Sequence, residues 1–166
     1  MMCQASAGKA AGAQENKLWK SRMAPTEEYL SGKVKKWSLP RLSPGREADG
    51  VPLKRLVLAQ GELAQVYDAE DGIRYIACIE LVPGGVRGNH LHRYKSEWIY
   101  VLSGSTDLLV KDPDAAQVET LRLARGDLAF IATGVAHALR VTGVGEAIEF
   151  SPAKFDPADV YRHPVA

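Results

Sequence analysis

Short apolar runs separated by turn residues dominate the chain from residue 51 onward. The runs are rich in Val, Ile, Leu, Tyr and Phe, and no long amphipathic helix pattern follows residue 50. Many short strands at regular spacing are typical of a β-sandwich or barrel. The sequence therefore predicts an all-β domain over residues 51–152. The expected strands are residues 53–58, 62–67, 73–82, 97–102, 106–111, 117–123, 128–132, 137–141 and 146–150.

Gly, Asp and Pro mark the expected turns between these strands. Two of the turns matter for the site, one at Ser103-Gly104 and one at Gly143. Both contain glycine, which commonly ends a strand. We therefore expect a chain reversal at each of these two places.

Residues 1–50 are expected to form a tail and an extended arm. Residues 1–20 have little to bury and predict disorder or loose helix. Translation starts at either Met1 or Met23. Thr26 predicts a cap for one helical turn over residues 26–30.

Two further segments predict irregular structure. Residues 40–50 hold prolines and glycines and are expected to form a loop. Residues 153–166 are expected to form a C-terminal tail with a short turn or an extended arm.

Composition narrows the class of protein. The 166 residues are 46% apolar and 25% charged, with a net charge of +1. This balance is ordinary for a globular protein and gives no reason to expect nucleic acid or a membrane as partner. The N-terminus does not resemble a secretory signal, and Cys3 and Cys78 are not expected to pair, so we expect a cytoplasmic location.

Two histidines, His90 and His92, stand one residue apart, and Glu97 follows shortly. Alternate residues of a strand point to one face, so both imidazoles would project together. Glu97 would share its face with apolar neighbours, where a buried carboxylate needs a charge partner. His137 lies behind its own turn, at the start of a later strand.

These four side chains are expected to hold one divalent transition metal ion. Three imidazoles and a carboxylate suit Fe, Mn, Ni or Zn and leave positions open for water or substrate. A histidine pair alone often occurs by chance, so the hypothesis depends on Glu97 and His137 joining His90 and His92.

The same stretch resembles the first motif of the cupin superfamily, G-x5-H-x-H-x4-E-x6-G, through Gly84, His90, His92, Glu97 and Gly104. The second motif is matched by Gly126, Gly134 and His137. Ala132 and Val141 stand where that motif has proline and asparagine, two positions that are usually structural. The resemblance implies a cupin-type double-stranded β-helix, or jelly-roll barrel, with the metal inside.

A narrower resemblance concerns Arg87 to His92 with Lys95 and Glu97. It is similar to cupin domains of nucleotide-sugar epimerases and 3,4-ketoisomerases of the RmlC-like group. This resemblance implies an enzyme that isomerises or epimerises a small polar molecule, and the substrate class it indicates is a sugar or nucleotide-sugar. A mononuclear iron dioxygenase and a non-catalytic ligand-binding cupin stay open as alternatives.

Several residues near the motif are candidates for chemistry or binding. Arg87 and Lys95 are expected to bind substrate, with a surface salt bridge and a solvated loop lysine as their alternatives. Tyr94, His90 and Glu97 are the candidate catalytic residues, because each can donate or accept a proton.

Aromatic residues on the face opposite Glu97 predict a packing role. Trp98 and Tyr100 are expected at a sheet–sheet or dimer contact, and Tyr75 is expected to pack in the core. We expect a homodimer, in which residues 37–40 cross to the partner chain.

Overall fold

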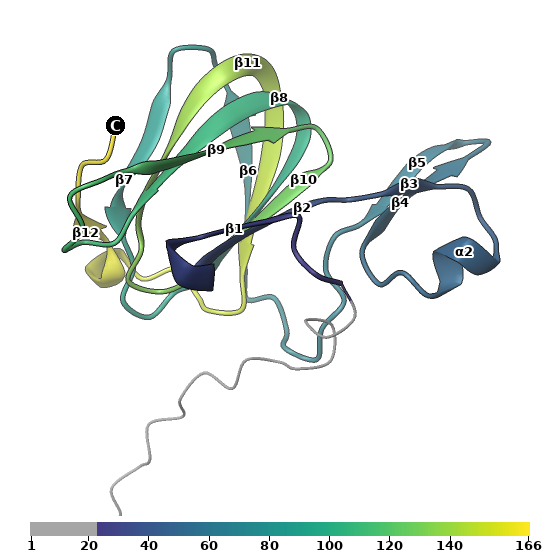
Figure 1. Ribbon diagram of the computed structural model, residues 1–166, viewed down its shortest axis with the longest axis horizontal. Coiled ribbons are helices and arrows are strands. Elements are labelled where there is room, and N and C mark those ends of the chain that lie inside the picture. The colour runs from purple at the N-terminus through teal and green to yellow at the C-terminus, as the bar shows by residue number, and fades with distance from the viewer. Residues whose placement is uncertain (1–22) are drawn as a thin grey trace, which may run out of the picture.

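A nine-stranded sheet wraps around the core of the molecule (Figure 1). The computed structural model describes residues 23–166. The all-β fold expected from the sequence is confirmed, and the strand pairs of this sheet are antiparallel. The strands are β1 (Glu27–Tyr29), β2 (Val34–Ser38), β6 (Tyr75–Leu81), β7 (Val86–Leu91), β8 (Glu97–Lys111), β9 (Glu119–Ala124), β10 (Asp127–Ile131), β11 (Ala136–Ser151) and β12 (Tyr161–Arg162).

A small second sheet stands beside this barrel in Figure 1. It consists of β3 (Arg41–Leu42), β4 (Lys54–Leu58) and β5 (Gly61–Gln65), with the one-turn helix α2 (Arg46–Asp49) next to it. Leu53, which precedes β4, packs against the outer face of the barrel with 2% of its surface exposed.

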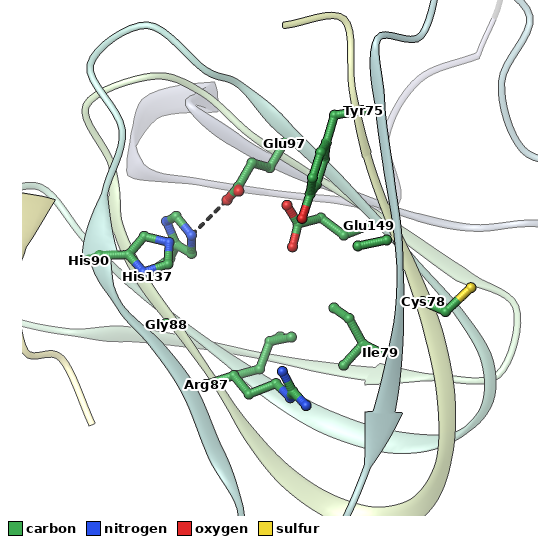
Figure 2. Close-up of a pocket in the computed structure, with 11 residues that line it drawn as sticks. Tyr75, Cys78, Ile79, Arg87, Gly88, His90, Glu97, His137 and Glu149 are labelled. Carbon is green, nitrogen blue, oxygen red and sulfur yellow. Dashed lines mark ion pairs between the residues drawn. The ribbon is translucent and has the colours of Figure 1, made fainter. Parts of the chain in front are cut away.

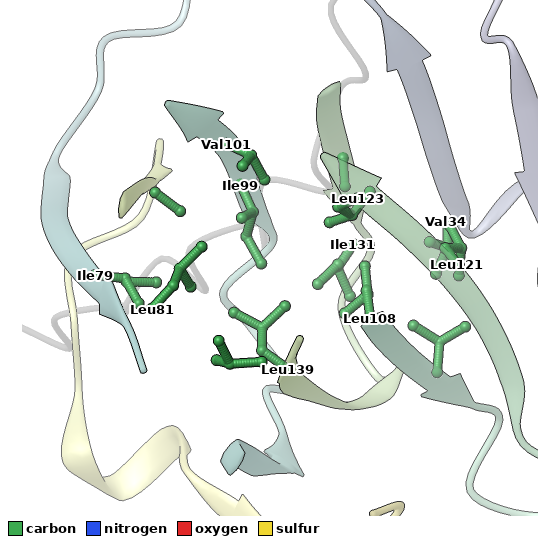
Figure 3. Close-up of a cluster of buried hydrophobic side chains, with 14 of the residues drawn as sticks. Val34, Ile79, Leu81, Ile99, Val101, Leu108, Leu121, Leu123, Ile131 and Leu139 are labelled. Carbon is green, nitrogen blue, oxygen red and sulfur yellow. The ribbon is translucent and has the colours of Figure 1, made fainter. Parts of the chain in front are cut away.

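Strand alternation divides the core into an inner and an outer part. Ile99 and Val101 of β8 point into the barrel with Leu139 and Val141 of β11 (Figure 3). These are the apolar neighbours that the sequence places on the faces of Glu97 and His137. The site therefore has an apolar floor, in which an unpaired charge would be costly.

Trp98 and Tyr100 point to the other face of β8, as expected. Trp98 stacks on Trp37 with ring centroids 5.6 Å apart and also packs against Phe150 and Tyr67 of the same chain. Aromatic pairs of this kind contribute about 0.5–1.5 kcal/mol beyond the area they bury.

Residues 37–40, expected to cross to a partner chain, pack within their own chain instead. Trp37 is 1% exposed and its strand β2 pairs with β10. The backbone N–H of Leu39 donates to the carbonyl of Gly126 at 3.1 Å. The backbone of this segment therefore finds its hydrogen-bond partners within the same chain. The homodimer itself stays a prediction.

The turns expected at Ser103-Gly104 and Gly143 are wrong. Residues 97–111 form one strand, β8, and residues 136–151 form one strand, β11. Their register shifts between Val141 and Gly143 and again between Gly143 and Ala147. Bulges of this kind absorb an extra residue without ending the ladder, so glycine here bends the strand rather than reversing it.

Two flanking segments, residues 26–30 and 40–50, also differ from expectation. Residues 27–29 form β1 rather than a helical turn, because Glu27 pairs with Lys36 of β2 and accepts a hydrogen bond from its ammonium group at 2.8 Å. The 3-10 turn η1 (Leu30–Gly32) follows. Residues 40–50 contain β3 and α2. The C-terminal tail contains the 3-10 turn η2 (Pro157–Asp159) and the strand β12, which pairs with β7.

The predicted disorder of residues 1–20 lies outside the described residues. Within residues 23–166, no helix combines the length and apolar character needed to span a membrane. Cys78 is a free, exposed thiol. The cytoplasmic location stays a prediction.

We predict that Gly104→Ala destabilises the fold more than Gly134→Ala. Both glycines have left-handed φ, +73° at Gly104 and +81° at Gly134. A Cβ at Gly104 would overlap the carbonyl oxygen of Val144, whereas nothing lies within 4 Å at Gly134. The conformation alone costs about 1–2 kcal/mol, and the overlap adds about 1–3 kcal/mol. Urea unfolding of both variants measures this, and equal losses would contradict the close approach of β8 and β11.

Candidate active site

His90 lies on strand β7, and His92 is the first residue after the end of that strand. Asn89 holds a left-handed conformation, with φ of +60°, directly before His90. Asn tolerates this region better than most residues, so Asn89 can bend the backbone directly before His90. The rings of His90 and His92 lie with centroids 4.8 Å apart.

Glu97 and His137 come from the neighbouring strands β8 and β11 and complete the cluster. His137 lies opposite His90 in the pairing of β11 with β7. Its Nε2 is 2.7 Å from Oε2 of Glu97 (Figure 2). Nε2 of His92 is 3.3 Å from Oε1 of Glu97. One ligand atom each of His90, Glu97 and His137 lies within 4.8 Å of the others. The structure thus brings together the four residues that the motifs select, with His92 at the edge of the tightest group.

Backbone carbonyls set the direction of two of these imidazoles. Nδ1 of His92 lies 2.8 Å from the carbonyl oxygen of Asp159, and Nδ1 of His137 lies 3.0 Å from that of Val135. A carbonyl only accepts, so each Nδ1 carries the proton. When neutral, such a ring presents its Nε2 lone pair toward Glu97; when protonated, it donates its Nε2–H to that carboxylate.

This arrangement fits a cation. A neutral Nε2 and a carboxylate oxygen are both acceptors, so the 2.7 Å contact between His137 and Glu97 needs a proton or a metal ion between the two groups. Backbone carbonyls on Nδ1 also orient histidine ligands in metal sites. The donor set of His90, His92, Glu97 and His137 is therefore chemically suited to a divalent transition metal.

A buried cation bridges two carboxylates that line the pocket, Glu97 and Glu149. Lys95 is 3% exposed, and its ammonium lies 2.5 Å from Oε1 of Glu97 and 2.5 Å from Oε1 of Glu149. It also lies 4.5 Å from the ring centroid of Tyr75. The interpretation of Lys95 as a solvated loop lysine is wrong, because two carboxylates hold it inside the barrel.

Burial and charge shift the pKa values of the cluster in opposite directions. Burial, followed by the charge of His137, lowers the pKa of His90 to about 4. Burial alone would raise the pKa of Glu97, but hydrogen bonds from His137 and His92 hold it well below its usual range. Burial would lower the pKa of His137, and the bond to Glu97 raises it instead. At neutral pH Glu97 is ionised and His90 is neutral.

Glu149 and Lys95 form an ion pair, with the carboxylate and the ammonium 2.5 Å apart. Burial, then the negative charge of Glu97, raises the pKa of the Glu149 carboxyl. Burial would lower the pKa of Lys95, but Glu97 and Glu149 raise it. The ammonium therefore stays charged, and the carboxylates beside it are held close together by that charge.

The side chains enclose a pocket of about 210 Å³. The histidines lie on one side of this pocket, and Tyr75 and Glu149 lie on the other (Figure 2). The volume is below the roughly 300–1,000 Å³ of pockets for drug-sized ligands. It suits a small polar group, such as one sugar ring, with the rest of a larger ligand outside.

Of the two remaining candidate residues, Arg87 lies at the pocket and Tyr94 does not. Arg87 is exposed and lines the pocket. Its expected alternative, a surface salt bridge, has no counterpart in residues 23–166, where no ion pair of Arg87 is formed. Tyr94 is 79% exposed and does not line the pocket, so the structure does not bring this candidate catalytic residue to the site.

Sequence reasoning missed Tyr75 and Glu149. Tyr75 was expected to pack in the core, yet it lines the pocket and stacks on Phe155 with centroids 5.9 Å apart. Glu149 is an even number of residues from His137 on one strand, a signal of a shared face. The expected turn at Gly143 hid this signal.

Comparison with known proteins agrees with the fold and the motifs. Residues 77–150 match the family model of the cupin domain. No curated protein matches the sequence.

Solved structures with the same fold include three nucleotide-sugar enzymes. The TDP-quinovose 3,4-ketoisomerase WlaRB from Campylobacter jejuni has a TM-score of 0.60 at 19% identity, over 68% of this chain and 89% of its own. The 3'-monoepimerase ChmJ from Streptomyces bikiniensis has a TM-score of 0.63 at 11% identity, over 82% and 72%. The dTDP-6-deoxy-D-glucose-3,5-epimerase RmlC from Legionella pneumophila has a TM-score of 0.61 at 13% identity, over 81% and 74%.

These identities are low, and the likeness shows a shared fold. The family match spans the strands that carry His90, His92, Glu97 and His137, and the barrel geometry is that of the RmlC-like structures. Residues 77–150 of this chain are therefore a cupin domain of RmlC-like fold.

Proposed function

We propose that this protein is an enzyme that moves a proton next to the carbonyl group of a nucleotide-linked sugar, and so isomerises or epimerises it. The observation that carries the proposal is the buried Lys95 ammonium, which contacts Glu97 and Glu149, two carboxylates that line the pocket with the imidazoles. Removal of a proton beside a carbonyl places negative charge on the carbonyl oxygen. A fixed ammonium in a dry pocket stabilises such a charge strongly.

Four residues would hold a divalent metal ion: His90, His92, Glu97 and His137. Such an ion supplies Lewis-acid stabilisation of a carbonyl oxygen. The protein's own contribution is to present the Nε2 atoms of His92 and His137 toward Glu97 through backbone carbonyls on Nδ1. Burial keeps His90 neutral, with a lone pair available at the pocket.

Glu149 is the proposed proton acceptor. Its carboxylate lines the pocket on the side opposite the histidines, and its side chain is 20% exposed (Figure 2). It takes the proton from the carbon beside the carbonyl, and the electron pair of that C–H bond moves to the carbonyl oxygen. Lys95 and Tyr75 stabilise that oxygen. Isomerisation follows when the proton returns to the former carbonyl carbon and the hydroxyl proton of the first carbon passes to the former carbonyl oxygen, which leaves the carbonyl on the first carbon. Epimerisation follows when a proton is delivered to the opposite face of the first carbon and the electron pair on oxygen restores the original carbonyl.

Arg87 is the proposed contact for the anionic part of the substrate. It is exposed and lines the pocket, where its guanidinium group can bind a phosphate bidentately. A pocket of about 210 Å³ accepts the sugar while the nucleotide stays outside. One structure of the same fold, the 3'-monoepimerase ChmJ, is in complex with dTDP-quinovose, which supports a ligand of this class.

The iron dioxygenase and the non-catalytic binder are weaker candidates. A dioxygenase usually has a dry, apolar pocket, and Ile79 and Leu139 contribute apolar surface here. Glu149 and Lys95, however, place a charged pair in the same wall. Such a pair is expensive to bury and has a clear use in proton transfer.

We predict that Glu149→Gln lowers proton exchange by about 10²–10⁴-fold, the usual contribution of a general base. The protein is incubated in D₂O with TDP-4-keto-6-deoxyglucose, the ligand of a 3,4-ketoisomerase of this fold. Deuterium entering the carbons beside the keto group is followed by NMR. Gln keeps the shape of Glu149 and an acceptor for Lys95, so the fold is preserved.

Glu146→Gln is the matched control. Glu146 lies on the same strand, β11, but is exposed, so its variant should exchange deuterium like the wild type. Equal exchange by both variants would remove Glu149 from the mechanism. No exchange by the wild-type protein with any TDP-keto-sugar would remove the proposed reaction.

We predict that Glu97→Gln and His137→Ala each lower affinity for Zn²⁺ or Co²⁺ by more than about 100-fold. Loss of a supporting partner already costs about 10–100-fold, and these residues would bind the ion directly. Calorimetric titration and elemental analysis of the dialysed proteins measure the effect. His163→Ala, a histidine of the C-terminal tail, should bind metal like the wild type. Full occupancy in Glu97→Gln would contradict the site.

A further inference from the structure

The carboxylate of Asp159 accepts hydrogen bonds from the loop that joins β7 to β8. It accepts hydrogen bonds from the backbone N–H groups of Arg93 at 2.8 Å, Tyr94 at 3.2 Å and Lys95 at 3.1 Å. The backbone carbonyl of Asp159 accepts from Nδ1 of His92 at 2.8 Å. Asp159 is 5% exposed, so these bonds form away from water. Asp159, which lies in the C-terminal tail, thus forms hydrogen bonds with every residue from His92 to Lys95.

The loop depends on these bonds because it has no strand partner. Residues 92–96 lie between β7 and β8 and belong to neither strand. Without Asp159, the N–H groups of residues 93–95 would lose their acceptor, and a buried unpaired N–H costs about 1–3 kcal/mol. This loop carries both His92 and Lys95, which contact the same oxygen of Glu97, Oε1.

Further contacts fix Asp159 in place. The side chain of Asp156 accepts from the N–H of Ala158 and so starts η2. Beyond η2, Tyr161 pairs with Leu91 of β7, and the guanidinium of Arg93 lies 4.2 Å from the Tyr161 ring centroid. Residues 156–166, the C-terminal segment, therefore hold Asp159 against the loop from both sides.

The side chain of Asn89 ties the end of the C-terminal segment to the histidine strand. Its Oδ1 accepts from the N–H groups of Val165 at 2.9 Å and Ala166 at 3.0 Å. Its carbonyl accepts from the N–H of His163 at 2.8 Å. The C-terminal segment thus contacts β7 directly before His90 and the loop directly after it.

We infer that Asp159 is a positioning residue for the site, which orients His92 and Lys95 through the loop without touching substrate or metal. Its carboxylate fixes the loop backbone, and its carbonyl fixes the Nδ1–H form of His92. The expected effect on metal rests on the proposed function. The expected effect on the loop and on the His92 ring does not.

The first test compares metal affinity in Asp159→Ala, Asp159→Asn and Asp127→Ala. Asp127 is a matched control, because it is 8% exposed and accepts from a backbone N–H, that of Ala124. It begins β10, whose far end, at Ile131, pairs with Glu97. Asp159→Ala should weaken Co²⁺ binding about 10–100-fold, as loss of a supporting partner does.

Asp159→Asn, which keeps one acceptor oxygen, should fall between Asp159→Ala and the wild type. Asp127→Ala should stay within about threefold of the wild type, although it lowers the melting temperature. An Asp159→Ala affinity no lower than that of Asp127→Ala would overturn the inference.

The second test uses the metal-free protein, so it holds even if the wild type binds no metal. Amide exchange should be slow at residues 93–95 in the wild type and in Asp127→Ala, and fast in Asp159→Ala. The ¹⁵N spectrum should show the Nδ1–H form of His92 in the first two proteins and a mixture of tautomers in the third. A folded Asp159→Ala protein with protected amides and a single His92 tautomer would overturn the positioning role. Absence of metal binding in the wild type would count against the proposed metal site alone.

Discussion

The buried carboxylate of Glu97 is the constraint on which the rest of the site depends. It lies on the apolar inner face of β8, where an unpaired charge would cost several kcal/mol. His137, His92 and Lys95 each approach one of its oxygens. His137 comes from β11, whereas His92 and Lys95 both come from the loop between β7 and β8. The fold must therefore bring β11, the β7–β8 loop and the start of β8 together to compensate one charge.

The long strands make that convergence possible. β8 and β11 run beside each other through most of their length, and the bulges near Gly143 let both continue across the barrel. As a result β11 carries His137 near one end and Glu149 near the other. A single strand thereby supplies an imidazole to one side of the pocket and a carboxylate to the other. Two groups on opposite sides are what proton removal and return require.

Alternation in the sequence predicted the part of the site that lies on regular strands. Glu97 with Ile99, and His137 with Leu139, face the barrel interior as a period of two requires. Glu149 could not be placed this way once Gly143 was interpreted as a turn, because a bulge and a turn share the same residue type. In the same way Ser103-Gly104 concealed the continuity of β8.

The rest of the site depends on contacts between residues far apart in the chain. Lys95 lies in a loop, where alternation says nothing, and its direction is set by Glu149 across the barrel. Its neighbour Tyr94 lies in the same loop and is exposed to solvent, which alternation could not predict either. Asp159 reaches the loop only through the pairing of β12 with β7. The cupin motif identifies four residues of the cluster, whereas the positions of Lys95 and Glu149 beside them follow from tertiary packing.

The most direct measurement is an anomalous-scattering map of crystals grown with Co²⁺ and a TDP-linked keto-sugar. The account predicts one peak about 2.0–2.2 Å from nitrogen and oxygen atoms of His90, His92, Glu97 and His137. It also predicts the keto oxygen in contact with Lys95, on the side of Glu149. A cobalt peak elsewhere on the protein, or a sugar bound away from Lys95 and Glu149, would contradict it.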